Sequence, residues 1–164
     1  MAYLLDANVF MAANNLHYGM DFCPAFWDWL IHKGNTGAVF SIDKVADEIA
    51  AGADSLSTWA VDHGSNLFRR TPASLAAQFG LVSAWATSQH FTPAAINTFL
   101  QVADFYLVAH ALAGGHVLVT NETPATSNAR IKIPNACLGL GVRYMTPFQM
   151  LRTEQARFVL GGQA

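Results

Sequence analysis

The chain has 164 residues, of which 52% are apolar and only 12% are charged, and its formal net charge at pH 7 is −2. This composition argues against a disordered chain. The net charge gives no sign of the strongly basic surface typical of nucleic-acid-binding proteins. The length fits a single domain over residues 1–164. No apolar segment is long enough to span a bilayer. Cys23 and Cys137 stand far apart without zinc-site spacing, so we expect a cytoplasmic protein with free thiols and no membrane contact.

Strands and helices alternate along the chain. Apolar runs predict strands at residues 2–5, 37–42, 116–120 and 142–145, with a short edge strand within 65–72. Helices are predicted at about 7–15, 25–33 (ended by Gly34), 43–52, 55–64, 72–89, 93–115 as one or two helices, and from Pro147. Because the strands are continuous apolar runs, we expect an α/β fold whose parallel sheet is covered on both faces.

Acidic residues are few, and four of them fall near the carboxyl ends of predicted strands. Asp6 follows the first strand directly, and Glu122 comes two residues after the strand 116–120. Glu48 lies on the helix after the second strand, and Asp104 opens the apolar helix that leads to the strand 116–120. Ligands bind at the carboxyl edge of such sheets, so these acids are candidate site residues.

Each acid also has an ordinary structural explanation. Asp6 and Asp104 are placed to cap helices, Glu48 to lie at the border between the buried and the exposed face of its helix, and Glu122 to be a loop acid. Taken together, however, four carboxylates at one sheet edge would repel each other and raise their pKa values without a cation. Carboxylate oxygens are the ligands that Mg²⁺ and Mn²⁺ prefer, and Asn8 is placed to orient Asp6 or bind a metal-bound water.

The ordered motifs "LLDANVF", "VADEI", "ADFYLVAHAL", "VLVTNE" and "MTPFQML" resemble the PIN domain, and in particular the VapC-type toxins and their uncharacterised relatives. The resemblance runs from Tyr3 to about Leu151. It implies a three-layer α/β/α PIN-like fold with a small parallel sheet of four or five strands. It also implies a ribonuclease that depends on Mg²⁺ or Mn²⁺, forms a homodimer and is often neutralised by a small antitoxin protein.

Carried over by position, the four acidic motif residues are Asp6, Glu48, Asp104 and Glu122, which the resemblance makes both catalytic residues and metal ligands. Asn8 and Thr120 are supporting residues in the first and fourth motifs. The fourth acid departs from the family pattern, because Glu122 stands where the family usually has Asp.

The loop after Glu122 also differs from the compact segment typical of VapC toxins. Asn128 in this loop is a candidate substitute ligand, and Arg130 and Lys132 are candidate contacts for an RNA phosphate.

Two other functions remain open. A PIN-like module without catalysis could bind RNA or a protein partner. A phosphatase of the haloacid-dehalogenase type also begins with an Asp after a strand, but it needs a second Asp where this chain has Asn8. No glycine-rich phosphate loop follows any predicted strand, which argues against a nucleotide-binding protein of the Rossmann or P-loop type.

Overall fold

The computed structural model describes residues 1–161, and within them five strands form one parallel sheet. The strands are β1 (Tyr3–Leu5), β2 (Val39–Ile42), β3 (Phe68–Arg69), β4 (Val117–Val119) and β5 (Tyr144–Met145). They pair in the order β3-β2-β1-β4-β5, so β1 is the central strand. Tyr3 is in register with Val39 on one side and with Val117 on the other. The predicted parallel sheet is therefore confirmed.

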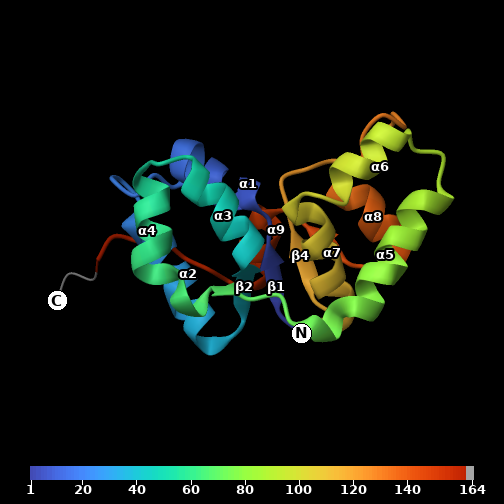
Figure 1. Cartoon of the computed structure of the whole chain (residues 1–164). Helices are drawn as coiled ribbons and strands as arrows, with labels where there is room; N and C mark the ends of the chain where they lie inside the picture. The colour runs from blue at the N-terminus through green and yellow to red at the C-terminus, as the bar shows by residue number, and fades with distance from the viewer. Residues whose placement is uncertain (162–164) are drawn as a thin grey trace.

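Helices flank the sheet on both sides. They are α1 (Ala7–Ala12), α2 (Pro24–Thr36), α3 (Asp43–Ala51), α4 (Ser55–His63), α5 (Ala76–Ser88), α6 (Pro93–Phe99), α7 (Ala103–Gly114), α8 (Ile133–Leu140) and α9 (Pro147–Thr153). A π-helical turn extends α1 from Ala13 to His17. Figure 1 shows α2, α3 and α4 toward the β2 end of the sheet and α5, α6 and α8 toward the β4 end. With helices on both faces of the parallel sheet, the fold is the predicted three-layer α/β/α arrangement.

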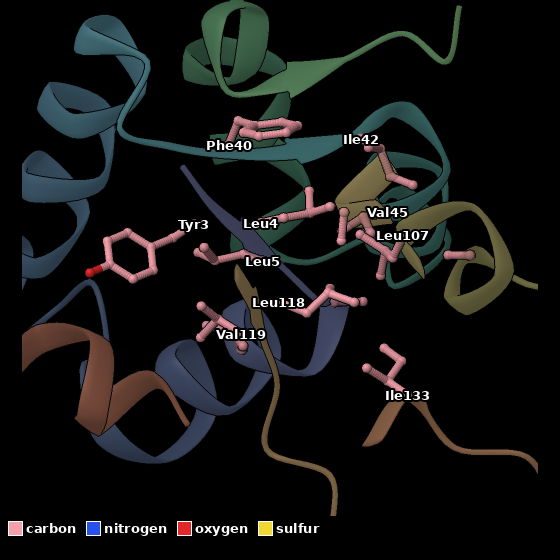
Figure 2. Packing of buried hydrophobic residues seen from close by; sticks show 14 of the residues in the cluster. Tyr3, Leu4, Leu5, Phe40, Ile42, Val45, Leu107, Leu118, Val119 and Ile133 are labelled. Carbon is pink, nitrogen blue, oxygen red and sulfur yellow. The ribbon is translucent and has the colours of Figure 1, made fainter. Parts of the chain in front are cut away.

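The central strands are buried on both faces, as their continuous apolar runs predict. Every residue of β1, β2 and β4 is buried. Figure 2 shows Leu4 directed toward Val45 of α3 and Leu107 of α7, whereas Tyr3 and Leu5 point to the other side of the strand. Alternate side chains of a strand point to opposite faces, so β1 contributes to the packing on both sides of the sheet.

One helix boundary differs from the sequence prediction, and the structure places a second one more precisely. Gly34 does not end the second helix, because α2 continues to Thr36 and Gly37 follows it with a φ of 78°. Gly34 instead lies inside α2, where it packs against Leu67. The predicted helical region 93–115 is two helices, and the break between them places Asp104 in the first turn of α7. Among residues 1–161, none of the helices has the length and apolar character that a bilayer crossing requires.

The end of α2 provides a test of this boundary. Gly37→Ala places a side chain in the left-handed region, and we expect it to lower the free energy of unfolding by about 1 kcal/mol. Gly80→Ala is the matched control, because Gly80 lies within α5 with open space around the position of a Cβ atom. We expect this control to stabilise the protein by roughly 0.5 kcal/mol. Urea denaturation measures both, and a neutral Gly37→Ala would contradict the boundary.

Candidate metal centre

The four acids predicted from the sequence line one cavity of about 550 Å³. Asp6 follows β1, Glu122 lies in the loop after β4, Glu48 is on α3 and Asp104 is in the first turn of α7. The positions after β1 and β4 meet because these two strands are parallel neighbours. Asn8, Met11 and Arg130 also line this cavity.

Asp6 is held by the hydroxyl group of Thr120. The Thr120 hydroxyl donates to Asp6 Oδ2 at 2.8 Å, and its oxygen accepts from Asn8 Nδ2 at 3.3 Å and from the Glu122 N–H at 3.1 Å. Asp6 occupies the N-cap position of α1, but its side chain makes no capping hydrogen bond. The capping explanation for this acid is therefore wrong, and its carboxyl group remains directed to the cavity. Asn8 and Thr120 are both part of the arrangement that orients it.

Burial raises the pKa values of the two aspartates far above the ordinary value. Asp6 is only 4% exposed, and its burial raises its pKa to about 7, with the charges of Glu122 and Glu48 also raising it and the Thr120 hydrogen bond lowering it. The pKa of Asp104 is raised to about 8, mainly by burial and in addition by the charges of Asp6, Glu122 and Glu48. Asp104 does not cap α7 either, since the N-cap residue is Val102.

Glu48 and Glu122 each accept a hydrogen bond from the first residue of a helix. A backbone hydrogen bond from Ala103, the first residue of α7, lowers the pKa of Glu48, although partial burial raises it more. Glu122 Oε2 accepts from the N–H of Ile133, the first residue of α8, at 3.0 Å. Neither helix has a capping bond from its own N-cap side chain. The positive ends of α7 and α8 therefore offset part of the negative charge of this cluster.

The donors in this cavity are of the type that binds Mg²⁺ or Mn²⁺, because all four are carboxylates. Within residues 1–161, however, no three histidine, cysteine, aspartate or glutamate side chains are close enough together to hold one ion. Mg²⁺ usually keeps several waters and takes one or two carboxylates directly. The donor set therefore fits a partly hydrated hard cation, and it does not fit a dehydrated structural metal.

Of the two predicted basic residues, one lines the cavity and the other does not. Arg130 lines the cavity and lowers the pKa of Asp104 through its positive charge. Lys132 precedes α8 as its N-cap residue and does not line the cavity. Asn128 is outside the cavity as well, and its carbonyl group accepts from Thr92 N–H at 3.0 Å.

One wall of the cavity was not predicted from the sequence. Helix α6 contributes Ala94, Ala95, Thr98 and Phe99 to the lining. These residue types carry no chemical signal for a site, and only the fold brings them next to the acids.

The raised pKa values predict how pH affects the metal-free protein. Between about pH 4 and pH 8 the folded state binds more protons at Asp6 and Asp104 than the unfolded chain does, so their contribution to stability falls as pH rises. We expect Asp6→Asn to stabilise the protein more at pH 8 than at pH 5, by on the order of 2 kcal/mol. Urea denaturation in the presence of a chelator measures this difference. Both proteins contain the same histidines, so the effect of the histidines on stability cancels in the comparison.

The control for this measurement is Asp62→Asn, since Asp62 is an exposed carboxyl on α4. Its effect should be the same at both pH values. An Asp6→Asn effect that does not grow with pH would mean that Asp6 titrates normally.

Comparison with known proteins places the chain in a family. The sequence matches the family described as "Domain of unknown function (DUF4411)" over residues 3–158, and curated proteins give no match. The structure is similar to the crystal structure of VapBC2 from Rickettsia felis bound to a DNA fragment from their promoter. That match has a TM-score of 0.54 and 15% identity, and covers 89% of this chain and 98% of that chain. The likeness confirms the predicted VapC-like PIN fold, and the chain belongs to the DUF4411 family.

Proposed function

We propose that this protein is a metal-dependent endoribonuclease that hydrolyses RNA phosphodiester bonds with Mg²⁺ or Mn²⁺. The observation that carries the proposal is the meeting of Asp6, Glu48, Asp104 and Glu122 at one cavity, although they come from four separate elements. Asp6 is buried and Asp104 is partly buried, and both have raised pKa values, so a bound cation would offset the cost of their negative charge.

In this proposal one or two of Asp6, Glu48 and Asp104 would bind the cation directly and the others through its waters, while Glu122 adds negative charge beside them. Such a cation would supply an activated water and stabilise the charge on the leaving oxygen. Thr120 and Asn8 keep Asp6 in place, so they are positioning residues. Arg130, which lines the same cavity, is available to bind an RNA phosphate. The protein acts mainly by position and charge.

We further propose that the nuclease is the toxin of a toxin–antitoxin pair, active as a homodimer in the cytoplasm. The similarity to VapBC2 supports the toxin assignment, and the two free cysteines of the described chain support the cytoplasmic location. Expression in a bacterial host tests it. The wild-type protein should arrest growth, Asp6→Asn should not, and light scattering should give a dimer. Undisturbed growth with folded wild-type protein would contradict the toxin assignment.

A PIN-like module that binds RNA or protein without catalysis is the second candidate. The observation in its favour is that Glu48 and Glu122 already accept hydrogen bonds from the first residues of α7 and α8. These acids would then be retained for helix stability alone. Calorimetric titration with Mn²⁺ separates the two functions, because a silent module has no specific Mn²⁺ site and the nuclease has one that Asp6→Asn weakens.

The proposed activity is tested by cleavage of a mixed RNA substrate with Mn²⁺, with Mg²⁺ and with chelator. We expect cleavage only with metal, and a loss of at least about 100-fold in Asp6→Asn, since the variant removes a charged ligand of the cation. Asp47→Asn is the matched control, because Asp47 is the exposed neighbour of Glu48 on α3 and does not line the cavity. Cleavage that persists in chelator would contradict the metal-dependent mechanism.

A further inference from the structure

The segment between β4 and α8, residues 121–132, forms a loop beside the acids, which we call the α8 loop. Apart from Ile131, its residues are exposed or half-buried, so burial does little to fix its course. It nevertheless brings Arg130 to the cavity. Within residues 1–161 the one ion pair within 4.0 Å joins Lys33 to Glu154, so no ion pair there holds Arg130 in place. The position of Arg130 therefore depends on how the backbone of the α8 loop is held.

Glu122 closes the α8 loop with both its backbone and its side chain. Its N–H donates to Thr120 Oγ1 at 3.1 Å, and its Oε2 accepts from the Ile133 N–H at 3.0 Å. The first bond ties the start of the loop to the hydroxyl group that also holds Asp6. The second bond joins the two ends of the loop, because Ile133 is the first residue of α8. One side chain therefore connects the end of β4 to the start of α8.

Helix α8 receives no cap from the residue before it. Lys132 is the N-cap residue and makes no side-chain cap hydrogen bond, and Pro134 has no N–H group. Serine, threonine, asparagine or aspartate at the N-cap position usually satisfies the first N–H groups of a helix. Here Glu122 supplies the acceptor from eleven residues away, and its negative charge faces the positive end of α8.

Other contacts hold the middle of the α8 loop. Asn135 Oδ1 accepts from the Ala125 N–H, and Asn135 Nδ2 donates to the Ala125 carbonyl, both at 3.0 Å. The Asn128 carbonyl accepts from the Thr92 N–H, also at 3.0 Å. Arg130 comes after these contacts and before α8, so the way in which α8 is joined to β4 decides where Arg130 lies.

Resting on the proposed function, we propose that Glu122 is a positioning residue, which caps α8 and thereby holds the α8 loop so that Arg130 faces the cavity. The acids that bind the cation in the proposed function are Asp6, Glu48 and Asp104, so this role leaves them unchanged. The loop places a guanidinium group, which can bind phosphate in a bidentate manner, beside those acids.

The length of the side chain distinguishes this role from that of a metal ligand. Glu122→Asp keeps the charge but shortens the side chain by one methylene, and the bond to Ile133 already spans 3.0 Å. Glu122→Gln keeps the length and an acceptor oxygen but removes the charge. The cap therefore survives in Glu122→Gln and is lost in Glu122→Asp. A metal ligand needs the charge and would show the reverse order.

Amide hydrogen exchange of Ile133, measured by NMR in the presence of a chelator, reports the cap directly. We expect this amide to exchange on the order of ten-fold faster in Glu122→Asp than in wild type, and close to the wild-type rate in Glu122→Gln. The urea midpoint should fall in Glu122→Asp and not in Glu122→Gln. Glu154→Asp is the matched control, because Glu154 binds Lys33 and does not line the cavity. It should leave the exchange of Ile133 unchanged.

The amide signals of Ala129 and Ile131, which flank Arg130, report the position of the loop. These signals should shift in Glu122→Asp and remain close to their wild-type positions in Glu122→Gln. Unchanged signals in Glu122→Asp, or an unchanged exchange rate of Ile133 in that variant, would overturn the positioning role.

Cleavage of the mixed RNA substrate with Mn²⁺ connects the loop to the reaction. Arg130→Ala should raise KM on the order of ten-fold in wild type and in Glu122→Gln. It should have no further effect in Glu122→Asp, where KM is already raised because the loop is released. Arg70→Ala, just after β3, is the control and should leave KM unchanged. Effects of Glu122→Asp and Arg130→Ala that simply add would contradict the proposal.

Failure of this role and failure of the proposed function give different results. The exchange and urea measurements need neither metal nor RNA. A wild-type protein that neither binds Mn²⁺ nor cleaves RNA would remove the nuclease, and the amide signals would still decide whether Glu122 holds the loop. Metal-dependent cleavage that is normal in Glu122→Asp and absent in Glu122→Gln would retain the nuclease and make Glu122 a ligand of the cation instead.

Discussion

Burial of the Asp6 carboxyl group at the end of the central strand removes it from water, and the surrounding protein has to compensate for its charge. Thr120 does so with a hydroxyl group from the neighbouring strand end. The positive ends of α7 and α8 face the same region and bind Glu48 and Glu122. The stability of the fold and the geometry of the candidate site therefore depend on the same polar groups. These groups come from the sheet edge, from the N-termini of α7 and α8, and from the four acids.

Much of the fold follows from patterns that are local in the sequence. The continuous apolar runs of β1, β2 and β4 predict strands buried on both faces, and the structure has them there. The end of α2 could not be predicted from the local sequence, because Gly34 and Gly37 are both placed where a glycine could end the helix. The choice depends on Leu67, which packs against Gly34 and is distant in the sequence.

The acids of the site could be predicted because a parallel sheet brings the ends of its strands to one edge. Asp6 and Glu122 follow from that rule, and Asp104 follows from the helix that leads into β4. Their hydrogen bonds could not be predicted, since Glu122 finds its donor eleven residues later at Ile133. The residues that α6 contributes to the cavity lining could not be predicted either, because alanines give no chemical signal and only the fold places them beside the acids.

The chain order of the elements determines when this site is complete during synthesis. β1 is made first, but β4 and Thr120 follow more than a hundred residues later, and the Ile133 N–H that holds Glu122 comes later still. A ribosome-bound chain that ends before residue 133 lacks the N–H group that holds its fourth acid. The acid cluster therefore cannot take its final form until the segment up to Ile133 has left the ribosome.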